Sequence, residues 1–194
     1  MNNASKAEIR AAALARRGLV SAEERTAFAA RLARVGLEFV SQHGARIVSL
    51  YGAINTEADP SALHAALAGA GIVTALPITR ARRTPLLFRC WKPGDALVRG
   101  QWGIGEPAPH LPECLPDLLF MPLAAFDRRG HRIGYGAGHY DCTLALLRAR
   151  QRVIAVGVAF SEQEVAAVPF EAHDQSLDFV VTQTEWITCA LGQD

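Results

Sequence analysis

The sequence lacks the paired cysteines from which a zinc site or a disulfide framework is built. It contains four cysteines, none of them in a C-x-x-C pair, and no His or Cys spacing matches a zinc site. Scattered cysteines in a chain of 194 residues are typical of the reducing cytosol. We therefore expect a cytoplasmic protein.

Long apolar runs and an excess of one charge are also missing. No apolar stretch is long enough to span a bilayer, and the first residues lack the apolar segment of a signal peptide. The 20 basic and 19 acidic residues leave a formal net charge of +1. This balance predicts no nucleic-acid partner and no membrane partner. The sequence does not separate a monomer from a small homo-oligomer.

Capping boxes predict two helices at the start of the chain. Ser5 and Glu8 are spaced so that each side chain can bond the other residue's backbone N–H, and Gly18 can end the helix that follows. Ser21 and its glutamate three residues later repeat this start, for a second helix that ends at Gly44.

Strands and helices then alternate along the rest of the chain. Apolar runs predict strands at residues 46–51, 72–76, 86–91, 96–98, 118–123, 153–160 and 179–182. Helices are expected at residues 59–71, 140–150 and 162–168 and near Glu185. Pro77 is expected to stop a strand, and residues 103–116 to form a loop. The pattern predicts one α/β domain over residues 1–194, a Rossmann-like layer sandwich with a mostly parallel central sheet flanked by helices.

The segment from Ala125 to Asp141 carries the chemistry. Gly134, Gly136 and Gly138 alternate directly before a predicted helix. Glycines let the main chain approach a ligand, and successive N–H groups at a helix N-terminus bind anions, so the segment predicts a phosphate cradle. It is neither a Walker A loop nor a G-x-G-x-x-G dinucleotide fingerprint.

Polar residues around the glycines fit the same chemistry. Arg132 can neutralise phosphate charge, and Asp141 can ligate Mg²⁺ directly or through water. Lys6 and Arg10 lie four residues apart, on one face of the first helix, and can reach one triphosphate or stay solvated. His139 can donate to a phosphate or a formyl oxygen, or it can cap the loop; both interpretations stay open.

The segment resembles the 5-formyltetrahydrofolate cyclo-ligase family, also called methenyltetrahydrofolate synthetase. The resemblance rests on Pro122, on Ala125-Phe126-Asp127, on Gly130 and on the unbroken run from Arg132 to Asp141. Weaker matches follow the family order at Lys6 and Arg10, Gly52, Glu57, residues 103–107, 157–160 and 169, His173-Asp174 and Asp178. His139 departs from the family, which commonly has an aromatic residue there.

The resemblance implies an enzyme that uses ATP and Mg²⁺ to close 5-formyltetrahydrofolate to 5,10-methenyltetrahydrofolate through a phosphorylated formyl group, releasing ADP and phosphate. It implies the catalytic residues Arg132, His139 and Asp141. It implies the ATP-binding residues Lys6, Arg10, Arg132, Ile133, Gly134, Tyr135, Gly136, Ala137, Gly138, His139 and Tyr140. It implies the substrate-binding residues Gly52, Glu57, Tyr135, Gly136, Ala137, Gly138 and His139. It implies Asp141 and Asp178 as metal ligands.

Two alternatives stay open from the residues alone. One is a nucleotide- or folate-binding regulatory module without turnover. The other is an enzyme similar to a sugar-phosphate isomerase, which needs no ATP.

Overall fold

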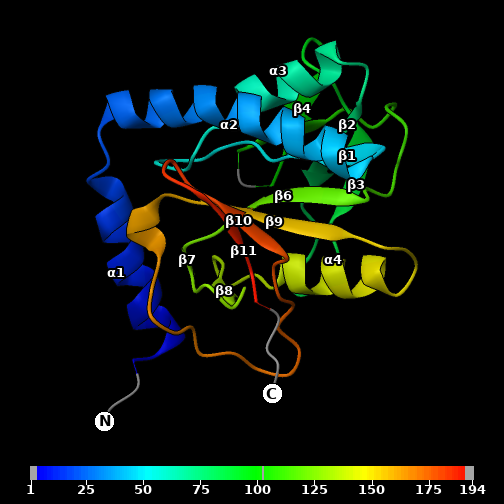
Figure 1. The fold of residues 1–194 in the computed structure, drawn as a ribbon. Helices are drawn as coiled ribbons and strands as arrows, with labels where there is room; N and C mark the ends of the chain where they lie inside the picture. Colours follow the sequence, from blue (N-terminus) through cyan, green and yellow to red (C-terminus); the bar gives the residue numbers. More distant parts are fainter. Residues whose placement is uncertain (1–3, 102, 191–194) are drawn as a thin grey trace.

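The computed structural model describes residues 4–101 and 103–190. They form a mixed α/β fold around a seven-stranded sheet with the order β11-β10-β9-β6-β1-β2-β3 (Figure 1). The strands of this sheet are β1 (Ile47–Ser49), β2 (Val73–Ile78), β3 (Leu87–Cys90), β6 (Leu118–Pro122), β9 (Ile154–Val158), β10 (Phe179–Val181) and β11 (Trp186–Thr188). The five central strands are parallel to one another, and β3 and β11 are antiparallel edge strands. The fold class predicted from the sequence is confirmed.

Helices cover both faces of this sheet. Figure 1 shows α2 (Ala22–His43) and α3 (Ser61–Gly69) on one face and α4 (His139–Arg148) on the other. The strand β6 is buried on both sides, since Leu118 and Phe120 join the core under α2 and α3 while Leu119 and Met121 join the core over α4. A strand covered on both faces reads as a continuous apolar run, which is why the sequence pattern located it.

Both predicted capping boxes are present. Glu8 Oε2 accepts a hydrogen bond from the Ser5 N–H at 2.8 Å at the start of α1 (Lys6–Gly18), and Glu24 does the same for Ser21 at the start of α2. Gly44 ends α2 in the left-handed conformation. None of the described helices is long and apolar enough to cross a membrane.

Two small antiparallel pairs lie outside the main sheet. One joins β4 (Leu97–Arg99) to β5 (Gly105–Pro107), and the other joins β7 (Ala125–Phe126) to β8 (Arg132–Ile133). The α1 helix packs on the second pair through Ala13, which shares a small core with Ala125 and Ile133. The loop expected at residues 103–116 therefore contains a strand.

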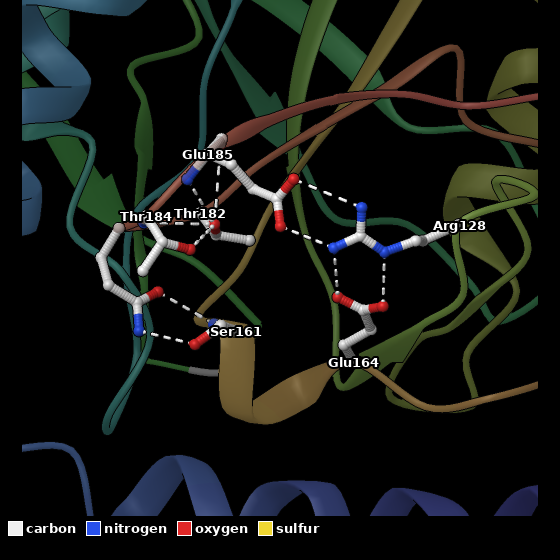
Figure 2. Close-up of polar contacts among 7 residues, drawn as sticks. Arg128, Ser161, Glu164, Thr182, Thr184 and Glu185 are labelled. Atoms are coloured by element: carbon white, nitrogen blue, oxygen red, sulfur yellow. Dashed lines mark hydrogen bonds and ion pairs between the residues drawn. The ribbon is translucent and has the colours of Figure 1, made fainter.

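The prediction of a helix near Glu185 is wrong, because the chain forms a hairpin between β10 and β11 there. The Thr182 hydroxyl accepts hydrogen bonds from the N–H groups of Thr184 and Glu185, and this local bonding favours a turn over a helix. Figure 2 shows this turn beside Arg128, whose guanidinium contacts the carboxylates of Glu185 at 2.6 Å and Glu164 at 2.7 Å.

The helix expected at residues 162–168 is a single 3₁₀ turn, η1 (Ser161–Gln163). The next residues are drawn into bridge pairing instead, since the Val165 N–H donates to the carbonyl oxygen of Phe126 in β7. Tertiary pairing overrides the local preference here.

Pro77 does not stop its strand but lies inside β2. The Ala75 carbonyl accepts from Leu50, whereas the Thr74 carbonyl accepts from Trp91 on the other side. The backbone N–H and C=O groups of odd-numbered residues in β2 therefore point towards β1, and the pairing of β2 with β1 ends at Ala75. The missing N–H of Pro77 costs no ladder bond, because no partner strand continues on that side.

The strand order positions the functional site. The chain leaves β1 for β2 on one side and later returns to β6 on the other side of β1. Connections that diverge from neighbouring parallel strands leave a crevice at the carboxyl ends of those strands. A ligand site is therefore expected beyond the ends of β1 and β6.

Candidate active site

A cavity of about 700 Å³ opens where this crevice is expected. Tyr51 and Gly52 line it beyond β1, Pro77 and Thr79 line it at the end of β2, and Pro122 lines it at the end of β6. With the exception of Asp178, every site residue inferred from the sequence lines this cavity. Segments far apart in the chain are thus brought to one place.

The glycine-rich loop forms one wall and presents its N–H groups. Gly136 and Gly138 have positive φ angles of 88° and 71°, which glycine adopts without strain. The loop carbonyls are occupied, since Arg10 donates to Gly134 O at 2.7 Å and Arg82 to Gly136 O at 2.8 Å. The N–H groups of residues 134–141, by contrast, donate to none of the residues that the structure describes. With the N-terminus of α4 beside them, these donors suit an anion.

Lys6 stands at the edge of this wall with its charge already paired. Its Nζ lies 2.6 Å from Asp174 Oδ2 and 3.3 Å from Glu171 Oε1. Partial burial lowers the pKa of Lys6, but the hydrogen bonds that it donates to Asp174 and Glu171 outweigh this and raise it. A bound anion would have to share Lys6 with these carboxylates.

Arg132 and Asp141 form a partly buried ion pair in the cavity. Arg132 Nη2 lies 2.7 Å from Asp141 Oδ1, and Nη1 of the same arginine donates to the carbonyl of Gln175. Burial lowers the pKa of Arg132, and the attraction of Asp141 opposes this. Asp141 Oδ1 also accepts from the Gln175 N–H at 3.2 Å, so the ion pair holds the segment from which Asp174 lines the cavity.

His139 has one ring nitrogen tied down and one unpaired. Its Nδ1 lies 3.1 Å from the carbonyl oxygen of Thr84, and a carbonyl only accepts, so Nδ1 carries the hydrogen. Its Nε2 is buried and meets no partner among the described residues. A neutral His139 can therefore accept a hydrogen bond from a ligand, whereas donation to a phosphate needs the doubly protonated ring.

Glu57 lines a second part of the cavity wall, in the turn after β1, where its carboxylate lies near the hydroxyl of Tyr135. Its Oε2 accepts from the Ile54 N–H at 2.9 Å, and its buried Oε1 has no hydrogen-bond partner in the described part of the chain. Burial raises the pKa of Glu57, while the Tyr135 hydroxyl, the Ile54 N–H and the charge of Arg17 act against this. A buried acceptor without a donor beside a cavity indicates a ligand that supplies one.

Comparison with known proteins decides the family. The model of the 5-formyltetrahydrofolate cyclo-ligase family matches residues 2–183. The chain belongs to this family.

Relatives in the 5-formyltetrahydrofolate cyclo-ligase family match over most of their length. The 5-formyltetrahydrofolate cyclo-ligase of Mycolicibacterium smegmatis is 34% identical over 190 residues, 94% of this chain and 95% of the relative. That of Haemophilus influenzae is 34% identical over 146 residues, 73% of this chain and 78% of the relative. The NMR structure of Aquifex aeolicus 5,10-methenyltetrahydrofolate synthetase superposes with a TM-score of 0.79 at 27% identity, covering 97% of this chain and 95% of that one.

Family membership confirms two predictions from the sequence: the resemblance itself and an enzyme of the ligase class. It also supports cyclo-ligase activity in folate metabolism.

The structure does not bring Asp178 to the cavity of this cyclo-ligase fold. Its Oδ2 accepts from the Ala155 N–H at 2.7 Å and lies 3.1 Å from Arg148 Nη2. The carboxylate that lines the cavity from this part of the chain is Asp174, four residues earlier.

Sequence reasoning left several cavity residues without a role. They include Tyr51, Thr79, Glu106 and His173. Glu106 lies in the Gly-Ile-x-Glu-Pro stretch that supports the family resemblance, and its Oε1 accepts from the Thr79 N–H at 2.9 Å. Arg82 and Arg83 also line the cavity; in the sequence they form a local cluster of charge with Arg80, a pattern that is more often solvated than bound to an anion.

Proposed function

We propose that this chain uses ATP and Mg²⁺ to close 5-formyltetrahydrofolate to 5,10-methenyltetrahydrofolate in the cytoplasm. ATP phosphorylates the formyl oxygen, the folate N10 attacks the activated carbon, and phosphate leaves. The observation that carries the proposal is that one cavity combines the N–H groups of residues 134–141 with Glu57 Oε1, none of which has a hydrogen-bond partner among the described residues. One wall suits phosphates, and the other suits a ligand that donates hydrogen bonds.

The phosphate wall fits the demands of phosphoryl transfer. Such a reaction needs alignment and charge neutralisation more than covalent help from the protein. The free N–H groups would hold the phosphates, and Lys6, Arg10 and Arg132 would offset their charge. Tyr135, Ile133 and Tyr140 would complete the surface on which the two substrates meet.

The cavity offers too few carboxylates to hold a metal ion by protein ligands alone, but enough for a Mg²⁺ ion that also binds water and the substrate phosphates. No cluster of three or more His, Cys, Asp or Glu side chains suited to a metal occurs among residues 4–101 and 103–190. Mg²⁺ usually keeps water and is held by one or two carboxylates together with substrate phosphates. Asp141, with Asp174 beside it, supplies those carboxylates, and the ion would neutralise charge on the phosphates. Asp178 is left out of this proposal.

The part of the wall around Glu57 fits the folate. Ionised Glu57 would accept hydrogen bonds from the donor edge of the pterin ring, and His139 Nε2, at the end of the glycine-rich loop, would offer the ligand a second acceptor. Gly52 has no side chain, so its backbone can pack against Ile104; a Cβ at this position would lie only 3.2 Å from the Ile104 side chain.

The test is the absorbance band of the methenyl product after mixing protein, 5-formyltetrahydrofolate, ATP and Mg²⁺. Product that needs both ATP and Mg²⁺ is expected, with Asp141→Asn inactive and Asp178→Asn active once its folding is verified. Binding of both ligands without product would favour a regulatory module. Turnover of a sugar phosphate that ignores ATP would favour an isomerase.

A further inference from the structure

Arg17 is a buried cation that has no role in the proposed reaction as described so far. It lies on α1, is only 4% exposed, and forms no salt bridge with a carboxylate in the described ranges. Burying an arginine without a paired anion is costly unless its hydrogen bonds are well placed. The hydrogen bonds that compensate for the burial of Arg17 therefore indicate its role.

The guanidinium of Arg17 joins the two walls of the cavity. Its Nη1 donates to the Tyr135 hydroxyl at 2.6 Å, in the glycine-rich loop. Its Nε donates to Thr56 Oγ1 at 3.0 Å, and Thr56 directly precedes Glu57. Arg17 itself does not line the cavity, so it acts on a ligand only through these neighbours.

Tyr135 connects this charge to Glu57. Burial and the nearby Glu57 carboxylate raise the pKa of Tyr135, so the phenol keeps its proton at neutral pH. Its oxygen already accepts from Arg17, which strengthens its own O–H as a donor. The Tyr135 hydroxyl is near enough to Glu57 to lower the pKa of that carboxyl, although Oε1 meets no donor in hydrogen-bonding geometry among the residues described.

Of the described groups that act on Glu57, Arg17 is the one with a positive charge. The others are the phenols of Tyr135 from the loop, Tyr51 from the end of β1 and Tyr140 from α4. Burial raises the pKa of Glu57, and the positive charge of Arg17 lowers it. Without Arg17, the protonated form of Glu57 would be favoured further, and that form is a poorer acceptor.

We infer that Arg17 is a positioning residue for folate binding, which aligns Glu57 by bonding both the Thr56 turn and Tyr135. The inference rests on the proposed function, because it assigns Glu57 to the folate. It adds a residue outside the cavity whose removal should affect one substrate and spare the other.

The test compares Arg17→Gln with wild type by measuring KM for each substrate across a pH series. KM for 5-formyltetrahydrofolate should rise about 10-fold or more at neutral pH, as for a lost hydrogen bond to a charged group. The acid-side loss of folate affinity should move to higher pH, since Glu57 then protonates more readily. KM for ATP should change less than about twofold, a difference within the usual scatter of surface substitutions.

Three further variants make this result specific. Arg17→Lys keeps the charge and should restore the acid limb in part. Tyr135→Phe removes the connecting hydroxyl and should raise KM for the folate while keeping the charge of Arg17. Arg16→Gln is the matched control, because Arg16 is the exposed neighbour on α1 and donates to the Glu162 carbonyl instead. It should leave both KM values and the pH profile unchanged.

The outcomes separate the inference from the proposed function. Wild type that forms no product overturns the proposed function, and the inference is then judged from equilibrium binding of 5-formyltetrahydrofolate to the same variants. Active wild type with an Arg17→Gln variant that keeps the wild-type pH profile overturns the inference alone. A variant with lower thermal stability and equal changes in both KM values also overturns it, since Arg17 would then only support the fold.

Discussion

Replacing Glu57 with glutamine should stabilise the ligand-free protein and weaken folate binding. The pKa of Glu57 is raised because burial outweighs the Tyr135 hydroxyl, the Ile54 N–H and the charge of Arg17. The ionised form therefore destabilises the fold at neutral pH. Glutamine keeps the shape, and its oxygen can still accept from the Ile54 N–H.

The stability gain follows from removing a buried charge that is incompletely compensated. Replacing such a charge with a neutral group stabilises proteins by about 1 kcal/mol or more, and in a chain of this size about 1 kcal/mol raises Tm by roughly 2–4 °C. The sign depends on pH. A carboxyl group with a raised folded pKa costs stability only as pH rises past its unfolded value, roughly 4.3 for glutamate, towards its folded value. The advantage of glutamine should therefore vanish at lower pH.

The affinity loss has a separate origin. Glu57 Oε1 is a buried acceptor without a partner in the described part of the chain, and a hydrogen bond to a charged group contributes about 1.5–3 kcal/mol, or roughly 10- to 150-fold in Kd. Glutamine can place an NH₂ group there, which opposes the donor edge of the pterin ring. ATP affinity should stay near the wild-type value.

Two measurements check the Glu57→Gln prediction: thermal unfolding between pH 4 and 8 without ligand, and titration with 5-formyltetrahydrofolate and with ATP. Lower Tm at neutral pH combined with unchanged folate affinity would refute both the strain assigned to Glu57 and its place in the site.

Three other substitutions probe different parts of the molecule. Asp127→Asn should destabilise the fold by about 1–3 kcal/mol, seen in urea unfolding, because this buried carboxylate accepts from the N–H groups of Val168, Arg129 and His131. Burial raises the pKa of Asp127, but those bonds outweigh it and lower the value, so its contribution should be present above the unfolded pKa and disappear as pH falls through the folded one. Gly130→Ala should lower Tm by several degrees, since φ is 94° and the added Cβ would lie 2.5 Å from the carbonyl oxygen of Leu177; a Tm within about 1 °C of wild type would contradict this. Asp141→Asn should cost at least about 100-fold in kcat and some stability, because Arg132 loses the charge of its partner; a variant that keeps wild-type kcat would exclude Asp141 from metal binding.

Much of the fold could be predicted because its rules are local. The capping boxes at Ser5 and Ser21 depend on residues three positions apart, and the apolar run at residues 118–122 reflects burial of one strand on both faces. The predictions that were wrong concern segments whose structure depends on residues far away in the sequence. Pro77 is tolerated only because no strand continues beside it, and the segment after η1 pairs with β7 instead of continuing a helix.

The glycine-rich segment by itself predicted the family and the helix that follows, because these depend on consecutive residues. Only the tertiary structure decided which charged residues reach the cavity. Asp174 and Asp178 are four residues apart and look alike in sequence, but Asp178 is bound to Ala155 and Arg148. Arg16 and Arg17 are neighbours, yet only Arg17 is buried, against a tyrosine 118 residues away. Such contacts depend on how separate elements pack, and no local pattern encodes them.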